Sequence, residues 1–106
     1  MRKNRNYGPP IILPDPGAGR CGLCEREVQQ TSRHHLVPRE QGGRYGPVVD
    51  LCQPCHSTVH LLLDNKDLAR RYNTIESLRT AEELQKYLHW VRRSRVERIS
   101  NRRARR

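Results

Sequence analysis

The chain has 106 residues, of which 34% are hydrophobic and none is Phe, so we expect one small domain whose thin core needs a metal or a disulfide for stability. The formal net charge of +10 lies in the two ends, because residues 1–20 carry four Lys/Arg and one Asp, and residues 91–106 carry eight Arg and one Glu. This charge pattern favours basic ends that bind a polyanion, and the alternative is a solubilising or merely disordered tail.

The N-terminal stretch is rich in residues that disfavour regular structure. Residues 1–20 contain four of the seven prolines and three of the seven glycines, which predicts a flexible basic arm. Its basic residues precede no apolar run of the secretory type, and no later run is long enough to span a membrane. We therefore expect a cytoplasmic protein, and in that reducing compartment paired cysteines bind metal more often than they form disulfides.

Short extended elements are expected next. The stretch EVQQTSRHHLVP is typical of a β-hairpin whose second strand carries His34 and His35 and ends at Pro38, which cannot donate to a ladder. A Gly-rich loop, REQGGRYGP, and a second extended run, VVDLC, follow it. From Cys52 onward the pattern becomes helical.

Three helical segments are predicted after that point. His56, His60 and Leu63 follow a spacing of four and three, which places them along one helix face. The segment DNKDLARRYN begins with Asp64, a good N-cap. The segment TAEELQKYLHWVRRSR begins with the spacing of a capping box, carries apolar residues at core spacing, and is expected to continue as a helix into the basic end before it frays.

All four cysteines fall into two CxxC pairs, Cys21 with Cys24 and Cys52 with Cys55. Two such pairs supply four thiolates, the ligand set of a closed tetrahedral structural Zn²⁺ site. Metal binding at this kind of site also stabilises the fold. Two local disulfides and an iron–sulfur cluster are the alternatives, and both fit the compartment and the spacing less well.

Four of the five histidines lie in the same part of the chain. On a strand, adjacent His34 and His35 point to opposite faces, whereas His56 and His60 lie one helical turn apart. If the zinc site holds the strand against the helix, one member of the strand pair reaches a metal bound by the helix pair, and the other stays free. Three protein ligands with open coordination positions are typical of a catalytic metal site. The remaining histidine, His89, is expected to be an ordinary surface or core residue.

The order CxxC, HHLxP, Gly-rich loop and LCxxCHxxxH resembles the HNH endonucleases of the ββα-metal class, in the variety that carries a four-cysteine zinc site. The resemblance covers residues 21 to about 63. It implies a small α+β fold with a zinc-stabilised ββα-metal (HNH/His-Me finger) core at 21–63, a helical C-terminal extension at 64–94 and a basic tail at 95–106.

The resemblance also implies roles for individual residues. His34, His56 and His60 would hold a catalytic divalent ion (Mg²⁺, Mn²⁺, Ni²⁺ or Zn²⁺), and His35 would be the general base that accepts a proton from the attacking water. The implied reaction is hydrolysis of DNA phosphodiester bonds to a 5′-phosphate and a 3′-hydroxyl, with RNA as a second possible substrate and no membrane partner. Neutral imidazoles suit both roles near neutral pH.

Two features of the loop bear on this interpretation. Arg39 and Arg44 flank the glycines and are candidates for nucleic-acid contact, or alternatively solvated loop charges. The family's central Asn is expected near positions 46–49, where this chain has GPVV, so that Asp50 or backbone held by Pro47 is the candidate substitute.

Two other functions compete with the nuclease. One is a non-catalytic, zinc-stabilised nucleic-acid-binding module, and the other is a zinc-ribbon domain that binds proteins. Both use the cysteines, but neither needs a His-His pair followed by HxxxH. The histidines therefore favour the endonuclease.

Overall fold

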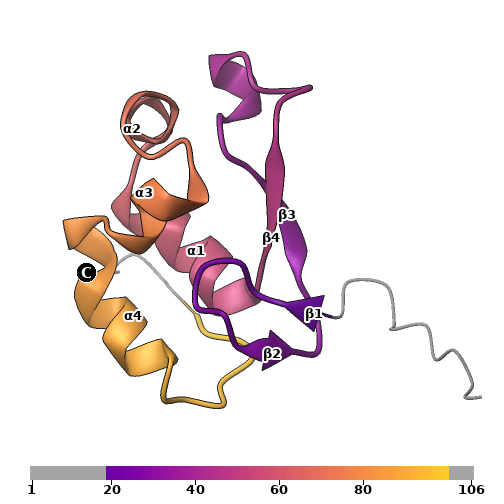
Figure 1. Cartoon of the computed structure of the whole chain (residues 1–106), viewed down its shortest axis with the longest axis vertical. Helices are drawn as coiled ribbons and strands as arrows, with labels where there is room; N and C mark the ends of the chain where they lie inside the picture. The colour runs from indigo at the N-terminus through magenta and orange to yellow at the C-terminus, as the bar shows by residue number, and fades with distance from the viewer. Residues whose placement is uncertain (1–18, 101–106) are drawn as a thin grey trace, which may run out of the picture.

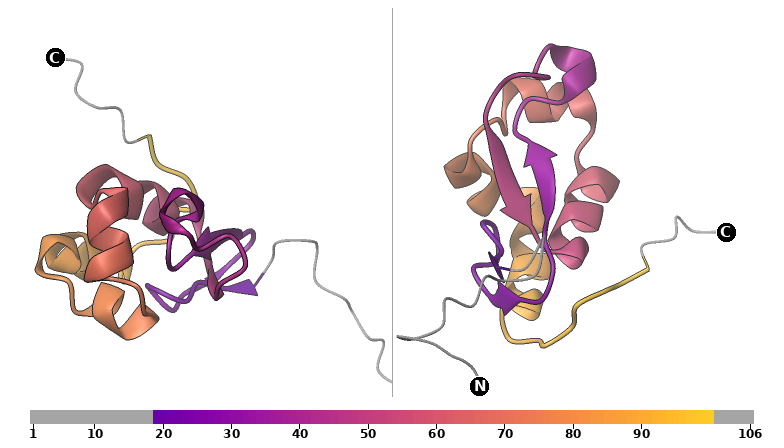
Figure 2. Two further views of the ribbon diagram at one scale, coloured as in Figure 1. Left: turned by 90° about the horizontal axis from the view of Figure 1, so that it is seen from above. Right: turned by 90° about the vertical axis from the view of Figure 1, so that its right-hand side faces the viewer.

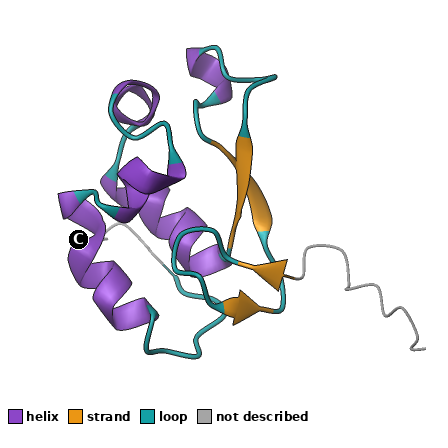
Figure 3. Ribbon diagram, viewed as in Figure 1, coloured by secondary structure: helices purple, strands orange, loops and turns teal. Residues whose placement is uncertain are grey.

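Two small antiparallel sheets, four α-helices and two 3₁₀ helices make up residues 19–100, the part of the chain that this computed structural model describes (Figures 1 and 3). The result is a small α+β domain. Most of the expected N-terminal arm and the last part of the expected basic tail, residues 101–106, lie outside the described residues. The end of that arm is not loose, because Gly19–Arg20 forms strand β1.

The first sheet encloses the first cysteine pair. Strand β1 pairs with β2 (Glu27–Val28), and the turn between them is closed by a hydrogen bond from the backbone N–H of Cys21 to the carbonyl of Arg26, 3.0 Å. The second sheet pairs β3 (Ser32–His35) with β4 (Val48–Leu51). The predicted hairpin within EVQQTSRHHLVP is therefore wrong: the turn around the cysteines draws the first half of this stretch back onto β1, and the histidine strand pairs with the predicted extended run VVDLC.

The connection between β3 and β4 is an ordered loop. Strand β3 ends at His35, three residues before Pro38, and Pro38 instead precedes the 3₁₀ helix η1 (Arg39–Gln41). Across the base of the loop, the N–H of Leu36 donates to the carbonyl of Pro47 at 3.1 Å. This bond closes the ladder immediately after the histidine pair.

The β3–β4 hairpin has two chemically different faces, because residues that stand opposite each other in an antiparallel pair share a face. In Figure 1 and in the left view of Figure 2, the helices lie on one side of this hairpin. The face toward the helices, here the inner face, and the opposite outer face carry two register pairs each. The inner pairs are Ser32 with Leu51 and His34 with Val49, and the outer pairs are Arg33 with Asp50 and His35 with Val48.

Helix α1 (Gln53–Leu62) follows β4 directly and has Pro54 in its first turn, where a missing N–H is harmless. Helix α2 (Asn65–Arg70) begins as predicted, because the Asp64 side chain accepts from the N–H of Asp67 at 2.8 Å. The remaining elements are α3 (Ile75–Arg79), the 3₁₀ helix η2 (Glu82–Leu84) and α4 (Gln85–Val91).

Two expectations about these helices are wrong. The capping box lies at Thr74 and Ser77, at the start of α3, and not at Thr80 and Glu83. The Thr80 hydroxyl instead donates to the carbonyl of Glu76 and ends that helix. Thr80 therefore belongs to the end of the short helix α3, and its hydroxyl is not available to cap the helix predicted to begin there.

The last helix also ends earlier than expected. It stops at Val91, and the chain then returns to the start of α1. There the Gln53 side chain accepts from the N–H of Ile99 at 2.7 Å and donates to its carbonyl at 3.0 Å. Two backbone groups that a helix would have satisfied internally are thus satisfied by one side chain.

The core is made mainly of leucines from the helices and the hairpin. The predicted core spacing in the last helical segment is confirmed, since Leu84, Leu88 and Val91 are fully buried and Tyr87 packs against them half-buried. Within residues 19–100, no helix combines the length and the hydrophobicity that crossing a membrane requires. The other large, fully buried apolar side chains are Leu23, Leu51, Val59, Leu68 and Leu78.

Candidate metal centres

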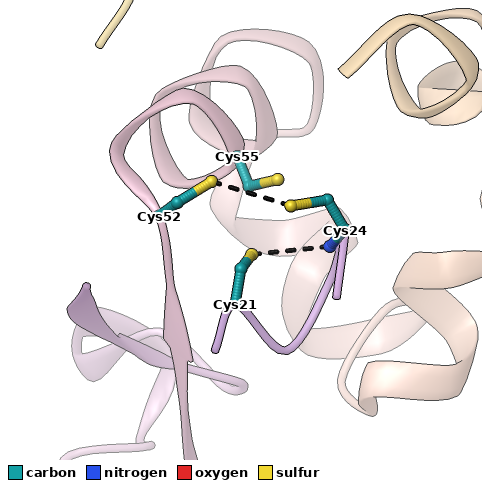
Figure 4. A group of neighbouring side chains, drawn as sticks. All are labelled: Cys21, Cys24, Cys52 and Cys55. Atoms are coloured by element: carbon teal, nitrogen blue, oxygen red, sulfur yellow. Dashed lines mark hydrogen bonds between the residues drawn. The ribbon is translucent and has the colours of Figure 1, made fainter. Parts of the chain in front are cut away.

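The four cysteines converge on one point between the first turn of α1 and the turn that follows β1 (Figure 4). All four are buried and free, and their sulfurs lie within 4.8 Å of one another. The Sγ atoms of Cys24 and Cys52 are 3.9 Å apart, far beyond a disulfide bond of about 2.05 Å. Sulfurs held about 2.3 Å from a tetrahedral Zn²⁺ are about 3.8 Å apart, so the spacing fits a structural zinc site.

Arg26 stabilises this cluster from the side. Its Nε donates to Cys24 Sγ at 3.3 Å and its Nη2 to Cys52 Sγ at 3.6 Å. Its Nη1 donates to the carbonyl of Ser94 at 2.9 Å. Four thiolates around a Zn²⁺ ion leave a net charge of −2, which this guanidinium offsets in part while it ties the segment after α4 to the site.

Hydrogen bonds between the four thiols shift their pKa values in opposite directions, since the pKa values of Cys21 and Cys24 are lowered and those of Cys52 and Cys55 are raised. Hydrogen bonds from the other cysteines, and then from the guanidinium, hold the pKa of Cys24 well below its usual value. Burial lowers the pKa of Arg26, but hydrogen bonds to Cys24 and Cys52 outweigh it and raise the pKa. The Tyr87 hydroxyl donates to Cys55 Sγ at 3.2 Å, and burial together with this bond raises the pKa of Tyr87.

Three of the predicted histidines form a second cluster on the inner side of the hairpin. His34 comes from β3, and His56 and His60 come from successive turns of α1. Their ring centroids are 5.1–5.3 Å apart, and one nitrogen of each lies within 4.8 Å of the others. The sequence prediction that one strand histidine joins the helix pair is thus matched by the geometry, which brings all three rings within reach of one ion.

The burial of this second cluster is graded. His34 is 1% exposed, His56 is half-buried and His60 is exposed, so the cluster is closed at the strand and open toward solvent at the helix. The Nε2 atom of His34 is buried and has no hydrogen-bond partner among the described residues. An unpartnered buried polar atom costs about 1–3 kcal/mol, which coordination of a metal ion would remove.

The protonation of the three rings also suits a metal. Burial, and then the neighbouring histidines, lower the pKa of His34 to about 4, and burial lowers the pKa of His56 and His60. Neutral imidazole is the form that coordinates. The Ser32 hydroxyl and Nδ1 of His56 are 2.6 Å apart, which leaves Nε2 as the free nitrogen of that ring.

The other predicted site residues do not join the histidine cluster. His35, Arg39 and Arg44 line one hollow of about 470 Å³, which they share with Arg33 and Tyr45. His35 stands on the outer face of β3, opposite to His34, as strand alternation requires. The two candidate substitutes for the family's Asn also differ. The carbonyl of Pro47 holds the backbone next to His35, whereas the Asp50 side chain lies exposed on the outer face.

Several residues around these sites could not be identified from local sequence patterns. Arg26 reaches Cys52 across 26 positions of the chain, Tyr87 reaches Cys55 across 32, and Ser32 reaches His56 across 24. Each is an ordinary residue of its type until the fold places it. Alternation along β3 is the one usable sign, since it puts Ser32 on the same face as His34. His89 is exposed on α4 and outside the cluster, as expected.

Comparison with known proteins gives one informative similarity. The chain is 42% identical over 82 residues to the uncharacterized protein YisB of Bacillus subtilis (strain 168). The aligned part covers 77% of this chain and 82% of that relative. No protein-family model and no solved structure matches the chain.

Proposed function

We propose that this chain, which belongs to the same family as YisB of Bacillus subtilis, is a metal-dependent endonuclease of the HNH (ββα-metal) class that hydrolyses phosphodiester bonds in DNA. The observation that carries the proposal is the convergence of His34, His56 and His60 from a hairpin and the helix that follows it. A structural zinc domain has no need of this second cluster, whereas a hydrolytic metal site with open coordination positions does.

The three imidazoles of His34, His56 and His60 would hold the divalent ion. When bound, such an ion stabilises the negative charge that develops on the phosphoryl and leaving oxygens. Neighbouring groups hold these three rings in position. The four-cysteine cluster fixes the start of α1 against the turn before the hairpin, and Ser32 orients the ring of His56. The exposed side of His60 leaves room for substrate.

His35 is proposed to accept the proton of the attacking water. It is adjacent to His34, and consecutive Cα atoms are about 3.8 Å apart. A phosphodiester lying across the edge of β3 that pairs with no strand within residues 19–100 would therefore meet residues of both faces of the strand. Arg39 and Arg44 line the hollow on the same side as His35 and would hold the neighbouring phosphates.

A non-catalytic nucleic-acid-binding module is the second candidate, because the arginines of the hollow serve binding equally well with or without hydrolysis. That function gives no reason for a buried His34 Nε2 that lacks a hydrogen-bond partner in the described part of the chain and lies beside two further imidazoles. Metal-dependent cleavage therefore separates the two candidates.

Supercoiled plasmid is the substrate for the test. Zinc-loaded protein with added Mg²⁺, Mn²⁺ or Ni²⁺ is expected to nick or linearise it, and His35→Ala is expected to reduce the rate at least a hundredfold, the usual contribution of a general base. His56→Ala is expected to abolish the cleavage that the added ion supports, because it removes one of the three ligands of that ion.

The matched control is His89→Ala, which removes an exposed histidine of α4 outside the cluster and should cleave like the wild type. Circular dichroism and zinc content establish that each variant is folded. Equal cleavage by wild type and His35→Ala would contradict the assignment of the base, and no cleavage by folded wild type with any of the three ions would contradict the nuclease.

A further inference from the structure

The hollow on the outer face of the β3–β4 hairpin contains two residues that the proposed chemistry does not use. Besides His35, Arg39 and Arg44, it is lined by Arg33 and Tyr45. Arg33 belongs to β3 and projects on the same side as His35, and the other three residues come from the loop that joins β3 to β4. The hollow thus combines strand and loop residues next to the candidate base.

The charge of this hollow is positive and uncompensated. None of the residues that line it is acidic, and Arg33, Arg39 and Arg44 make no ion pair or side-chain hydrogen bond within residues 19–100. Two carboxylates are near: Asp50 stands opposite Arg33 in the register, and Glu40 follows Arg39 in the chain. Both are exposed, and neither forms an ion pair with an arginine of the described part of the chain. Three free guanidiniums in one hollow suit consecutive phosphates.

The loop that carries two of these arginines is held in one conformation. Gly42 has a φ of 94°, and a Cβ at Gly43 would collide with the carbonyl of Val37. The N–H groups of Gln41 and Gly43 both donate to the carbonyl of Pro38, at 2.8 and 3.0 Å. The backbone is therefore preorganised, which lowers the entropy lost when a ligand binds.

Tyr45 is the least expected residue of the hollow, because it is an aromatic ring that is 90% exposed. Its described ring contact is the guanidinium of Arg44, whose Cζ lies 5.3 Å from the ring centroid. An exposed aromatic beside arginines is the arrangement with which proteins hold bases of unpaired nucleic acid, since every base offers a π-face. In a duplex the same faces are covered by neighbouring base pairs.

We infer that this hollow binds an unpaired stretch of DNA, with Arg33, Arg39 and Arg44 on the phosphates and Tyr45 stacked on a nucleobase. The inference rests on the proposed function, because it takes the bound strand to be the one that the histidine centre cleaves. It deepens that function by making single-stranded DNA, or a duplex with an unpaired segment at the cut, the preferred substrate.

Binding of the full-length protein to oligonucleotides tests this inference. Kd is measured for a single-stranded DNA and for the duplex of the same sequence, with structural zinc present, no other divalent ion added, and the oligonucleotides checked to be intact afterwards. Wild type is expected to prefer the single strand. Tyr45→Ala is expected to weaken single-strand binding roughly tenfold, in line with about 1–3 kcal/mol per stacked base, and to leave duplex binding within about twofold.

Four further measurements make the result specific. Tyr45→Phe keeps the π-face and should retain the preference, and Trp90→Ala, which removes another exposed aromatic outside the hollow, should change neither Kd. A 2-aminopurine base in the single strand should be quenched by wild type and not by Tyr45→Ala. Arg33→Ala should weaken the binding of both oligonucleotides and reduce the slope of log Kd against the logarithm of the salt concentration by about one.

The inference is overturned if Tyr45→Ala leaves the ratio of the two Kd values unchanged, or if the corresponding RNA binds more tightly than the DNA. These outcomes are independent of cleavage. A Tyr45-dependent preference together with a wild type that cleaves neither the plasmid nor single-stranded DNA would overturn the proposed function and would still identify unpaired DNA as the ligand of the hollow.

Discussion

The four-cysteine and three-histidine clusters use the same helix in opposite ways. Cys55 and His56 are adjacent, yet they belong to different sites, because consecutive residues of an α-helix point about 100° apart. The cysteine cluster is buried on all sides and ringed by donors from distant segments, whereas the histidine cluster is closed at His34 and open at His60. The closed cluster can hold the hairpin and the helix together, and the open one can use that arrangement to bind a ligand.

The largest expected effect comes from breaking the closed cluster. Cys52→Ser is expected to be unfolded at about 25 °C and to show no cooperative thermal transition. Binding of a structural Zn²⁺ contributes about 10–16 kcal/mol in small domains, which is as much as the whole stability of a typical domain. Thermal unfolding by circular dichroism and the zinc content measure this effect.

His60→Ala, which opens the other cluster at its exposed end, is the matched comparison and should keep the Tm within a few degrees of wild type. If Cys52→Ser unfolds cooperatively at the wild-type Tm, the cysteines do not hold this fold together, and the distinction between the two clusters is lost.

A smaller effect is expected at the edge of the closed cluster. Arg26→Ala removes hydrogen bonds to the sulfurs of Cys24 and Cys52 and to the carbonyl of Ser94. Charge-assisted bonds contribute about 1.5–3 kcal/mol, so we expect the Tm to fall by roughly 10 °C while zinc stays bound.

Two variants sharpen this measurement. Arg26→Lys keeps the charge but not the three-way geometry and should recover part of the loss, whereas Arg70→Ala, on the exposed face of α2, should change the Tm little. A Tm of Arg26→Ala equal to that of Arg70→Ala would show that the guanidinium has no part in supporting the cluster.

Those parts of the two clusters whose residues are close together in the chain could be predicted from the local sequence. Spacing within a turn or a helix is local, so the two CxxC pairs, the HxxxH pair and the N-cap at Asp64 follow directly from the sequence. The separation of His34 from His35 onto two faces follows from strand alternation in the same way.

Features that depend on distant partners could not be predicted from local patterns. Strand β3 pairs with β4 and not with the preceding strand, because the turn at the first cysteine pair has already joined that strand to β1. The return of the C-terminal segment to Gln53 spans 46 positions, and nothing in the run of arginines indicates it. The same holds for Arg33 and Tyr45, which become neighbours only when the hairpin closes.

Anomalous diffraction from crystals of the zinc-loaded protein soaked in Mn²⁺ tests the central claim most directly. We expect one zinc peak among the four sulfurs and a separate manganese peak bonded to nitrogens of His34, His56 and His60, with the second peak absent in His56→Ala. A well-ordered wild-type crystal with the zinc peak alone, or with manganese bound away from these three rings, would contradict the account.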